Sequence, residues 1–221
     1  MASYQQLIDD TLGWLNRQDA APFIPGWVLL VETQLAQTLR ARCMVKFATQ
    51  AIDAPYITMP PDFATMESIR DNATGELLEL KDAWSGHWTA PSSDAWVAGA
   101  TVGTQPVATA YRLTGDCLEF LPHPMVPDPP DPAWQPQQVR MGWYAKPKPL
   151  VLPDDTNPIL EQLYGVYLFG VLSKGAIWAL DDARAQQADT QWQTVITQAN
   201  LSKQQSDYSG APYRSELATV F

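Results

Sequence analysis

The spacing of apolar residues changes twice along this chain of 221 residues, and that change limits the folds it can adopt. Near the N-terminus, and again after residue 158, apolar residues recur every three or four positions, which is the period of an amphipathic helix. Between these regions, short runs rich in Val, Ile, Tyr and Thr are separated by turn residues, as in β-strands. The pattern therefore predicts helices at both ends and a β-rich middle.

Two amphipathic helices are predicted at the N-terminus. The first lies within SYQQLIDDTLGWL and has an apolar face made of Leu7, Thr11, Trp14 and Leu15. The second lies within IPGWVLLVETQLAQTLRARCM and has an apolar face made of Val28, Val31, Leu35 and Leu39. We expect its polar face to consist of Glu32, Thr33, Gln37, Arg40 and Arg42.

Two further helices are predicted after Pro158. The first has a broad apolar surface made of Ile159, Leu163, Val166, Tyr167 and Leu172. It also contains three glycines, at 165, 170 and 175, which lower helix propensity and so indicate close approach of other elements. Asp181 is placed to cap the last helix, whose inner face holds Trp192, Val195, Ile196 and Ala199. From about residue 202 the chain is polar and broken by Gly and Pro, and we expect an extended tail.

The middle of the chain reads as seven short strands with two glycine-containing hairpin turns, at 72–75 and 114–116. Two irregular insertions, at 84–106 and 122–137, interrupt the strands. They contain Trp88, Trp96 and Trp134, which either form a contact surface or fold back into small local cores. A prediction for the whole chain follows: an α+β protein that is mainly helical, with an antiparallel helical bundle. The bundle would use 1–43 and 146–201, with a β-hairpin-rich insertion at 44–145 and a tail at 202–221.

Composition excludes several classes of protein. The net charge of −10, without a basic stripe, is unsuited to tight nucleic-acid binding, because phosphate contacts need clustered Lys and Arg. Cys43 and Cys117 are far apart in the sequence, which favours two buried, reduced thiols. The N-terminal residues do not resemble a signal peptide, and the longest apolar stretch is too short and too interrupted to span a bilayer. We therefore expect synthesis in the cytoplasm and no membrane association.

Residues that could carry catalysis are scarce. His87 and His123 have no neighbouring metal ligands in the sequence, and the common hydrolase, NTPase and dinucleotide motifs are missing. The acidic pairs at 9–10, 154–155 and 181–182 are explained by helix capping or solvation. We accordingly predict no catalytic, metal or cofactor-binding residues, and no enzyme.

The segment WYAKPKPLVLPDDTNPIL, at 143–160, reads as a junction between the β-rich region and a helix. Its prolines at 147 and 149 hold the chain extended, Asn157 is the expected N-cap, and Pro158 suits the first helical position. Lys146 and Lys148 are either solvated or reach an acidic neighbour or a DNA phosphate.

Several phrases occur in the same order as in the head-to-tail adaptor (connector) proteins of tailed bacteriophages. YITMPPDFATMESI resembles their strand, Leu-Pro-x-Asp-Phe, strand phrase, and YRLTGDCLEFLPHP resembles their glycine-turn hairpin. MGWYAKPKPLVLPDDTNPILEQLYGVYLFGVLSKGAIWALDDARA is similar to their Tyr-rich strand, Asp-Asp-Thr-Asn lead-in and helix ending before Asp-Asp. The insertions at 84–106 and 122–137 depart from the family pattern, so the resemblance does not identify their partners.

This resemblance implies a structural virion protein without enzymatic activity or cofactors. Family members form rings of twelve beneath the portal, extend the DNA channel, and present a surface to tail or nozzle proteins. Their C-terminal tails dock onto the portal, which points to Tyr208, Tyr213, Arg214 and Phe221 here. Two alternatives remain open at this stage: a tail-tube or tail-completion component, and a module that binds glycan or peptide through its aromatic loops.

Overall fold

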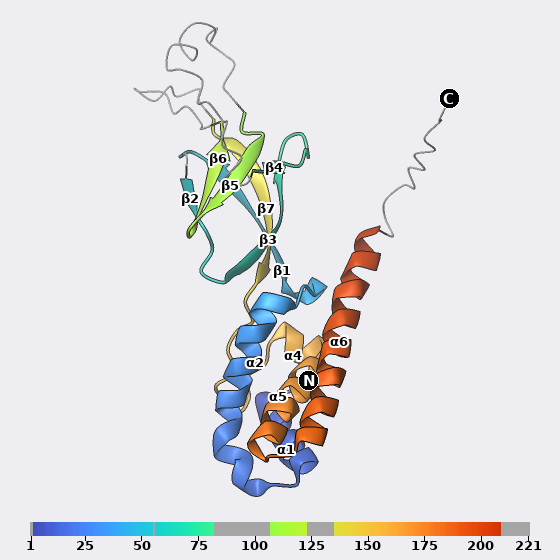
Figure 1. Cartoon of the computed structure of the whole chain (residues 1–221). Coiled ribbons are helices and arrows are strands. Elements are labelled where there is room, and N and C mark those ends of the chain that lie inside the picture. The colour runs from blue at the N-terminus through green and yellow to red at the C-terminus, as the bar shows by residue number, and fades with distance from the viewer. Residues whose placement is uncertain (1, 55, 82–106, 123–134, 209–221) are drawn as a thin grey trace, which may run out of the picture. The chain divides into compact units, whose positions relative to one another are not determined.

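The chain consists of two compact units, each with its own core (Figure 1). The computed structural model describes residues 2–54, 56–81, 107–122 and 135–208. Met1–Met44 and Ala145–Phe221 belong to a helical unit, and Val45–Tyr144 form a β unit. The β unit is therefore inserted into the sequence of the helical unit.

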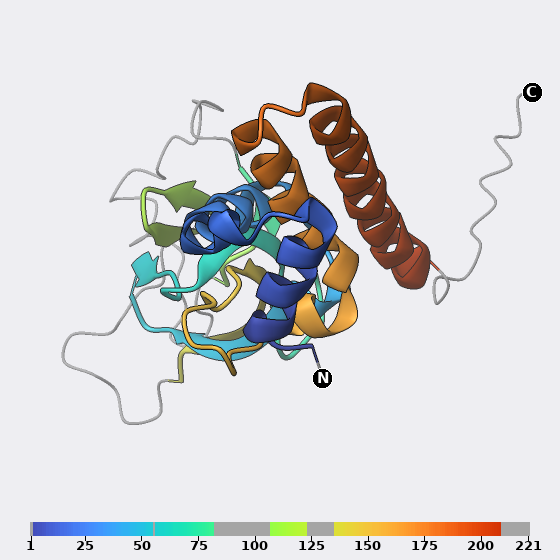
Figure 2. The same ribbon diagram turned by 90° about the horizontal axis from the view of Figure 1, so that it is seen from below.

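The helical unit is organised around α5, which contacts α1, α2, α4 and α6. Figure 2 shows α5 and the longer α6 side by side. The α-helices of the described chain are α1 (Tyr4–Leu15), α2 (Ile24–Thr38), α4 (Pro158–Gln162), α5 (Tyr164–Trp178) and α6 (Asp182–Tyr208). Two 3₁₀ turns, η1 (Gln18–Phe23) and η2 (Arg42–Met44), precede and follow α2.

Glycines allow neighbouring helices to approach α5 closely. A Cβ atom on Gly170 would lie 2.9 Å from Nε1 of Trp192 on α6 and 3.0 Å from Cγ2 of Val31 on α2. A Cβ atom on Gly175 would lie 2.7 Å from a methyl carbon of Leu15 on α1. The distances at these two glycines confirm the close approach predicted from the sequence. Gly165 differs, because its nearest neighbour would be at an ordinary contact distance of 3.6 Å.

Most helix starts match the sequence prediction, and two helix boundaries do not. The side chains of Asn157 and Asp181 accept hydrogen bonds from backbone N–H groups three residues later, as expected of N-caps. The single helix expected after Pro158 is broken at Leu163, whose backbone (φ −131°, ψ 47°) is not helical. Helix α6 continues to Tyr208, so residues 202–208, which we expected in the tail, are helical.

The described residues of the β unit form two sheets. One has the order β1-β7-β3, and the other has the order β2-β6-β5-β4. The strands are β1 (Val45–Ile52), β2 (Tyr56–Thr58), β3 (Phe63–Asp71), β4 (Glu79–Leu80), β5 (Ala110–Thr114), β6 (Cys117–Leu121) and β7 (Gln137–Ala145). β1 and β7 are antiparallel over eight residue pairs, from Val45↔Tyr144 to Ile52↔Gln137. The buried apolar side chains of the unit include Ile57, Ile69, Leu118, Phe120, Val139 and Met141.

The two predicted hairpin turns both form, but only one joins a complete hairpin. Gly115 adopts a positive φ of 59° and connects β5 to β6 in antiparallel register. Gly75 likewise adopts a φ of 76°, and Asp71 caps its turn by accepting hydrogen bonds from the N–H groups of residues 73 and 74. After this turn the chain makes only one bridge back to β3, at Leu77, and then enters the other sheet as β4, parallel to β5.

The prediction of a mainly helical antiparallel bundle was wrong. The described chain is α+β, with five α-helices, two sheets and 25% of its residues in strands. Two physical reasons explain the error. The break at Leu163 leaves a short α4 and makes α5 a central helix rather than one member of a four-helix bundle. In addition, β1, β3 and β7 are eight or nine residues long, so the β region is large enough to bury a core of its own.

Candidate interaction surface

Most of the contact residues predicted from the sequence lie outside the described residues. These are Trp88, Trp96, Trp134, Tyr213, Arg214 and Phe221. Tyr208 is the last residue of α6, and its side chain is not described. The two histidines are also outside the described ranges. The binding roles of these contact residues therefore remain predictions.

The described residues hold few groups suited to catalysis or metal binding. Within the described ranges, no three His, Cys, Asp or Glu side chains are grouped so that they could hold a metal ion. Cys43 and Cys117 are free thiols, as predicted, but each is half-buried rather than fully buried. None of the helices in the described part of the chain is long and apolar enough to cross a membrane. The features that stand out are instead polar contacts that fix the backbone and apolar side chains that face outward.

A buried amide anchors the junction, which we define as residues 146–157. Asn157 is 3% exposed, and both polar atoms of its side chain make hydrogen bonds. Its Nδ2 donates to the Lys148 carbonyl (3.0 Å) and to the Tyr167 hydroxyl (2.8 Å), and its Oδ1 accepts from the Leu160 N–H (2.9 Å). One residue thereby caps α4, fixes the junction and connects both to α5.

A buried carboxylate extends this network to α2. Oε1 of Glu32 accepts from the Leu150 N–H at 3.1 Å and from the Tyr167 hydroxyl at 3.3 Å. Glu32 is only 7% exposed, so placing it on the polar face of α2 was wrong. Burial raises the pKa of Glu32, and burial together with the nearby carboxylate raises the pKa of Tyr167. The signal was in the sequence, because positions 28, 32, 35 and 39 follow the same helical spacing.

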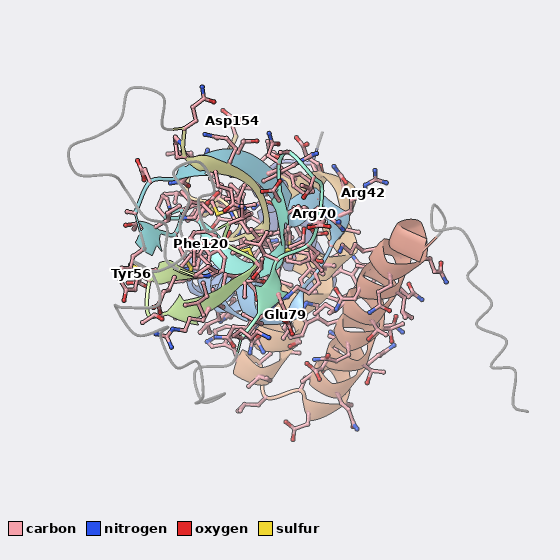
Figure 3. The ribbon with its side chains drawn as sticks, turned by 90° about the horizontal axis from the view of Figure 1, so that it is seen from above. Arg42, Tyr56, Arg70, Glu79, Phe120 and Asp154 are labelled. Atoms are coloured by element: carbon pink, nitrogen blue, oxygen red, sulfur yellow. The ribbon has the colours of Figure 1, made fainter. Side chains whose placement is uncertain are left out.

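The outer side of the junction is a tight turn closed by Asp155. The carboxylate of Asp155 accepts from the N–H groups of Val151 (3.0 Å) and Leu152 (2.7 Å) and from Nζ of Lys148 (3.0 Å). These donors, the Leu152 N–H first, lower the pKa of Asp155 to about 2. The carbonyls of residues 153 and 155 accept the free N–H groups at the start of α1. The adjacent Asp154 is exposed, and its side chain points outward (Figure 3).

This turn presents apolar side chains to solvent. Val151 is 71% exposed and Leu152 is 63% exposed, although their backbone is fixed by the bonds to Asp155. Leu29 and Leu30 on α2 are also more than half exposed. We call Val151, Leu152 and Leu29 the junction patch, because Leu29 and Val151 line the same hollow. A cavity of about 410 Å³ lies between α1, α2 and the junction, and Leu29 and Val151 contribute to its lining.

A second apolar region lies elsewhere on the helical unit, between α1, α5 and α6. There a groove of about 260 Å³ has apolar walls that include Trp14, Phe169 and Leu172, and a polar side with Arg184 and Gln191. Trp14, which the sequence placed on the apolar face of α1, is 64% exposed. It faces the groove instead, as α1 ends one residue later. We call this region the Trp14 groove.

An aromatic cluster closes the end of the helical unit where η1 meets α5. The rings of Phe23 and Trp178 have centroids 5.2 Å apart, and those of Trp27 and Trp178 are 5.9 Å apart. The Arg17 guanidinium lies 5.1 Å from the Trp178 ring centroid, within cation–π range. These tilted ring contacts pack η1 and α2 against the end of α5.

On the β unit, the buried acid Glu119 forms an ion pair with the half-buried Arg112. Glu119 on β6 is 2% exposed, and its carboxylate accepts hydrogen bonds from Arg112 and from the Tyr56 hydroxyl. Figure 3 shows Tyr56 on β2 and Phe120 on β6, whose side chain is fully buried. The Arg112 and Tyr56 side chains therefore both pair with this buried acid.

Taken together, these contacts suit protein recognition. Buried polar groups hold the backbone of the junction, and the exposed side chains beside it are apolar. The family model for the SU10 adaptor protein matches residues 2–216, and no curated protein matches the chain. The match covers nearly the whole sequence and confirms the resemblance to phage head-to-tail adaptors. This chain belongs to the SU10 adaptor protein family, a family of structural phage adaptors rather than of enzymes.

Proposed function

We propose that twelve copies of this chain form a ring beneath the portal of a tailed phage, at the neck of the virion. The ring extends the DNA channel and links the capsid to tail or nozzle proteins. The observation that carries this proposal is the match of the adaptor family model to residues 2–216. The net charge of −10 supports the channel role, because an acidic wall lets DNA pass without binding it.

The apolar surfaces of the helical unit support assembly into a ring. A closed ring requires two different, complementary faces on each copy. The junction patch and the Trp14 groove are two separate apolar regions, lined by different helices. Apolar surface of this kind on a rigid backbone is typical of protein contacts.

We further propose different partners for the two sets of predicted contact residues. The C-terminal residues Tyr208, Tyr213, Arg214 and Phe221 dock onto the portal, and the loop residues Trp88, Trp96 and Trp134 contact tail or nozzle proteins. Aromatic and Arg side chains provide much of the binding energy in many interfaces. Neither role needs a metal or a cofactor.

Electron microscopy of the protein assembled on purified portal rings tests the stoichiometry. A twelve-fold ring below the portal is the expected result. A ring of another symmetry that binds only tail proteins would favour a tail-completion component, and a monomer that never joins a portal would overturn the proposal.

The two contact roles can be separated by a pair of variants. Truncation after Tyr208 keeps the whole described range of α6, Asp182–Tyr208. We expect this truncation to abolish portal binding in a co-sedimentation assay while binding to tail proteins is retained. Replacement of the three loop tryptophans by Ala should have the opposite effect. Equal loss of both activities in both variants would contradict the assignment.

A further inference from the structure

Two polar groups line the 410 Å³ cavity beside the junction and lack partners there. The Tyr4 hydroxyl is buried and makes no hydrogen bond within the described chain, and Tyr4 as a whole is 3% exposed. Glu32 uses Oε1 for the Leu150 N–H and the Tyr167 hydroxyl, and its Oε2 accepts no hydrogen bond from a described residue. A buried hydroxyl without a partner is costly, and the second oxygen of the Glu32 carboxylate is open to a donor, so these two groups point to something that binds in the cavity.

The charge of Glu32 is also uncompensated. None of the ion pairs found among the described residues includes Glu32. Within the junction, Lys148 pairs with Asp155 on the outer side of the turn and not with Glu32. A buried carboxylate is normally paired, and breaking such a pair by removing the cation is strongly unfavourable.

The remaining lining of the cavity is apolar. Ile8 on α1, Leu29 on α2, and Leu150 and Val151 of the junction form much of it, together with prolines. The volume of about 410 Å³ exceeds the ~150 Å³ of an apolar cavity that takes up benzene in another protein. The cavity is therefore large enough for a long side chain, with an apolar wall and an acidic group.

We propose that this cavity, the Glu32 pocket, binds a Lys or Arg side chain presented by a neighbouring protein in the virion neck. The aliphatic stem lies along Leu29, Ile8 and Leu150, and the cationic head donates to Glu32 Oε2 and the Tyr4 hydroxyl. An apolar side chain in the pocket would give Glu32 Oε2 and the Tyr4 hydroxyl no hydrogen-bond donor. Water alone would leave the apolar wall of the pocket in contact with solvent. The proposal depends on the proposed function only for the existence of a protein neighbour.

The chemistry of the pocket can be tested on the free, full-length chain. The probes are n-butylguanidinium and n-butylammonium, with n-butylurea as a neutral compound of nearly the same shape. NMR titration is expected to give a dissociation constant on the order of millimolar for the two cations, as is usual for ligands of this size. Butylurea is expected to bind at least about tenfold more weakly, because it cannot neutralise Glu32.

Three variants make the test specific. Glu32→Gln removes the charge while keeping an acceptor oxygen for the Leu150 N–H, and should weaken cation binding at least about tenfold. Tyr4→Phe removes only an oxygen that has no partner, so it should fold normally and weaken binding a few-fold, roughly the effect of one hydrogen bond. Glu76→Gln, an exposed acid in the β unit, makes the same change of charge and should have no effect.

Equal binding of butylurea and the cations, or full binding by Glu32→Gln, would overturn the proposal, as would no binding of any probe. These outcomes are independent of ring formation, since the titration uses the free chain. In the assembled neck, density for a neighbour's Lys or Arg beside Glu32 supports the assignment of the occupant. Density for water or an apolar side chain there would refute it.

Discussion

The close packing around Gly170 leads to a quantitative prediction about the helical unit. Replacing Gly170 by Ala would place a methyl group 2.9 Å from Nε1 of Trp192 and 3.0 Å and 3.1 Å from the two methyl carbons of Val31. Real Cβ atoms are almost never this close to another heavy atom, so α2 or α6 must shift. The substitution therefore has two opposite effects on stability: Ala has a higher helix propensity than Gly, but its methyl group clashes with the neighbouring helices.

The two effects can be weighed. Ala is favoured over Gly within a helix by about 1 kcal/mol. Inserting a methyl group into a well-packed core opposes folding by about 1–3 kcal/mol. Both neighbours come from anchored helices, and Trp192 is 4% exposed, so we expect the upper part of this range. The net prediction for Gly170→Ala is a loss of about 1–2 kcal/mol in the free energy of unfolding.

Gly13→Ala provides a matched control on α1. Gly13 is exposed, and an added Cβ atom would have nothing within 4 Å. The propensity term should act alone there and raise stability by about 0.5–1 kcal/mol. Urea denaturation followed by far-UV circular dichroism measures both variants under the same conditions. If Gly170→Ala were as stable as Gly13→Ala, the close approach of α2, α5 and α6 would not exist as described.

Three further predictions concern the junction. Asn157→Ala removes an N-cap and leaves the Tyr167 hydroxyl and two backbone groups with fewer partners. Urea denaturation should therefore show that the free energy of unfolding falls by about 2–4 kcal/mol. A fall below ~0.5 kcal/mol would contradict the network. Burial raises the pKa of Glu32 in the folded chain above its ordinary value of 4.5. The contribution of Glu32 to the free energy of unfolding is therefore fully present below pH 4.5 and is lost as pH rises through the pKa of the folded state. Glu32→Gln should therefore be more stable than the wild type at pH 7, with an advantage that shrinks below pH 4.5 in denaturation curves; a constant difference would refute this. The pKa of Asp155 is lowered from 3.8 to about 2, so its contribution is present above pH 3.8 and is lost as pH falls toward 2. Asp155→Asn should be less stable at pH 7, and the difference should shrink on acidification; a difference that grew would contradict the bonds to Asp155.

The local structure of this chain could largely be predicted from the sequence. The seven strands, the positive-φ glycines at 75 and 115 and the N-caps Asn157 and Asp181 were all identified from short patterns. Each depends on residues close to one another in the sequence, which is why a pattern of a few residues suffices.

The errors depend on contacts between residues that are distant in the sequence. Glu32 was placed on a polar face because it is charged, yet it is buried where it meets Leu150 and Tyr167, more than a hundred residues away. Trp14 was placed on the apolar face of α1, yet α1 ends beside it and leaves its side chain exposed in a groove. The chain also leaves one sheet for the other after the turn at 72–75, which no local pattern specifies.

The rigidity of the junction has a consequence for binding that the exposed residues alone would not show. An exposed loop that becomes ordered on binding opposes association by about 0.5–1.5 kcal/mol for each side chain that is immobilised. Val151 and Leu152 are already fixed at the backbone by Asp155, and the same segment is bonded to α1, α2 and α5. Part of the ordering has thus occurred during folding, so contact through this patch retains more of the free energy from apolar burial. The proposed contacts with neighbouring proteins gain from such a surface.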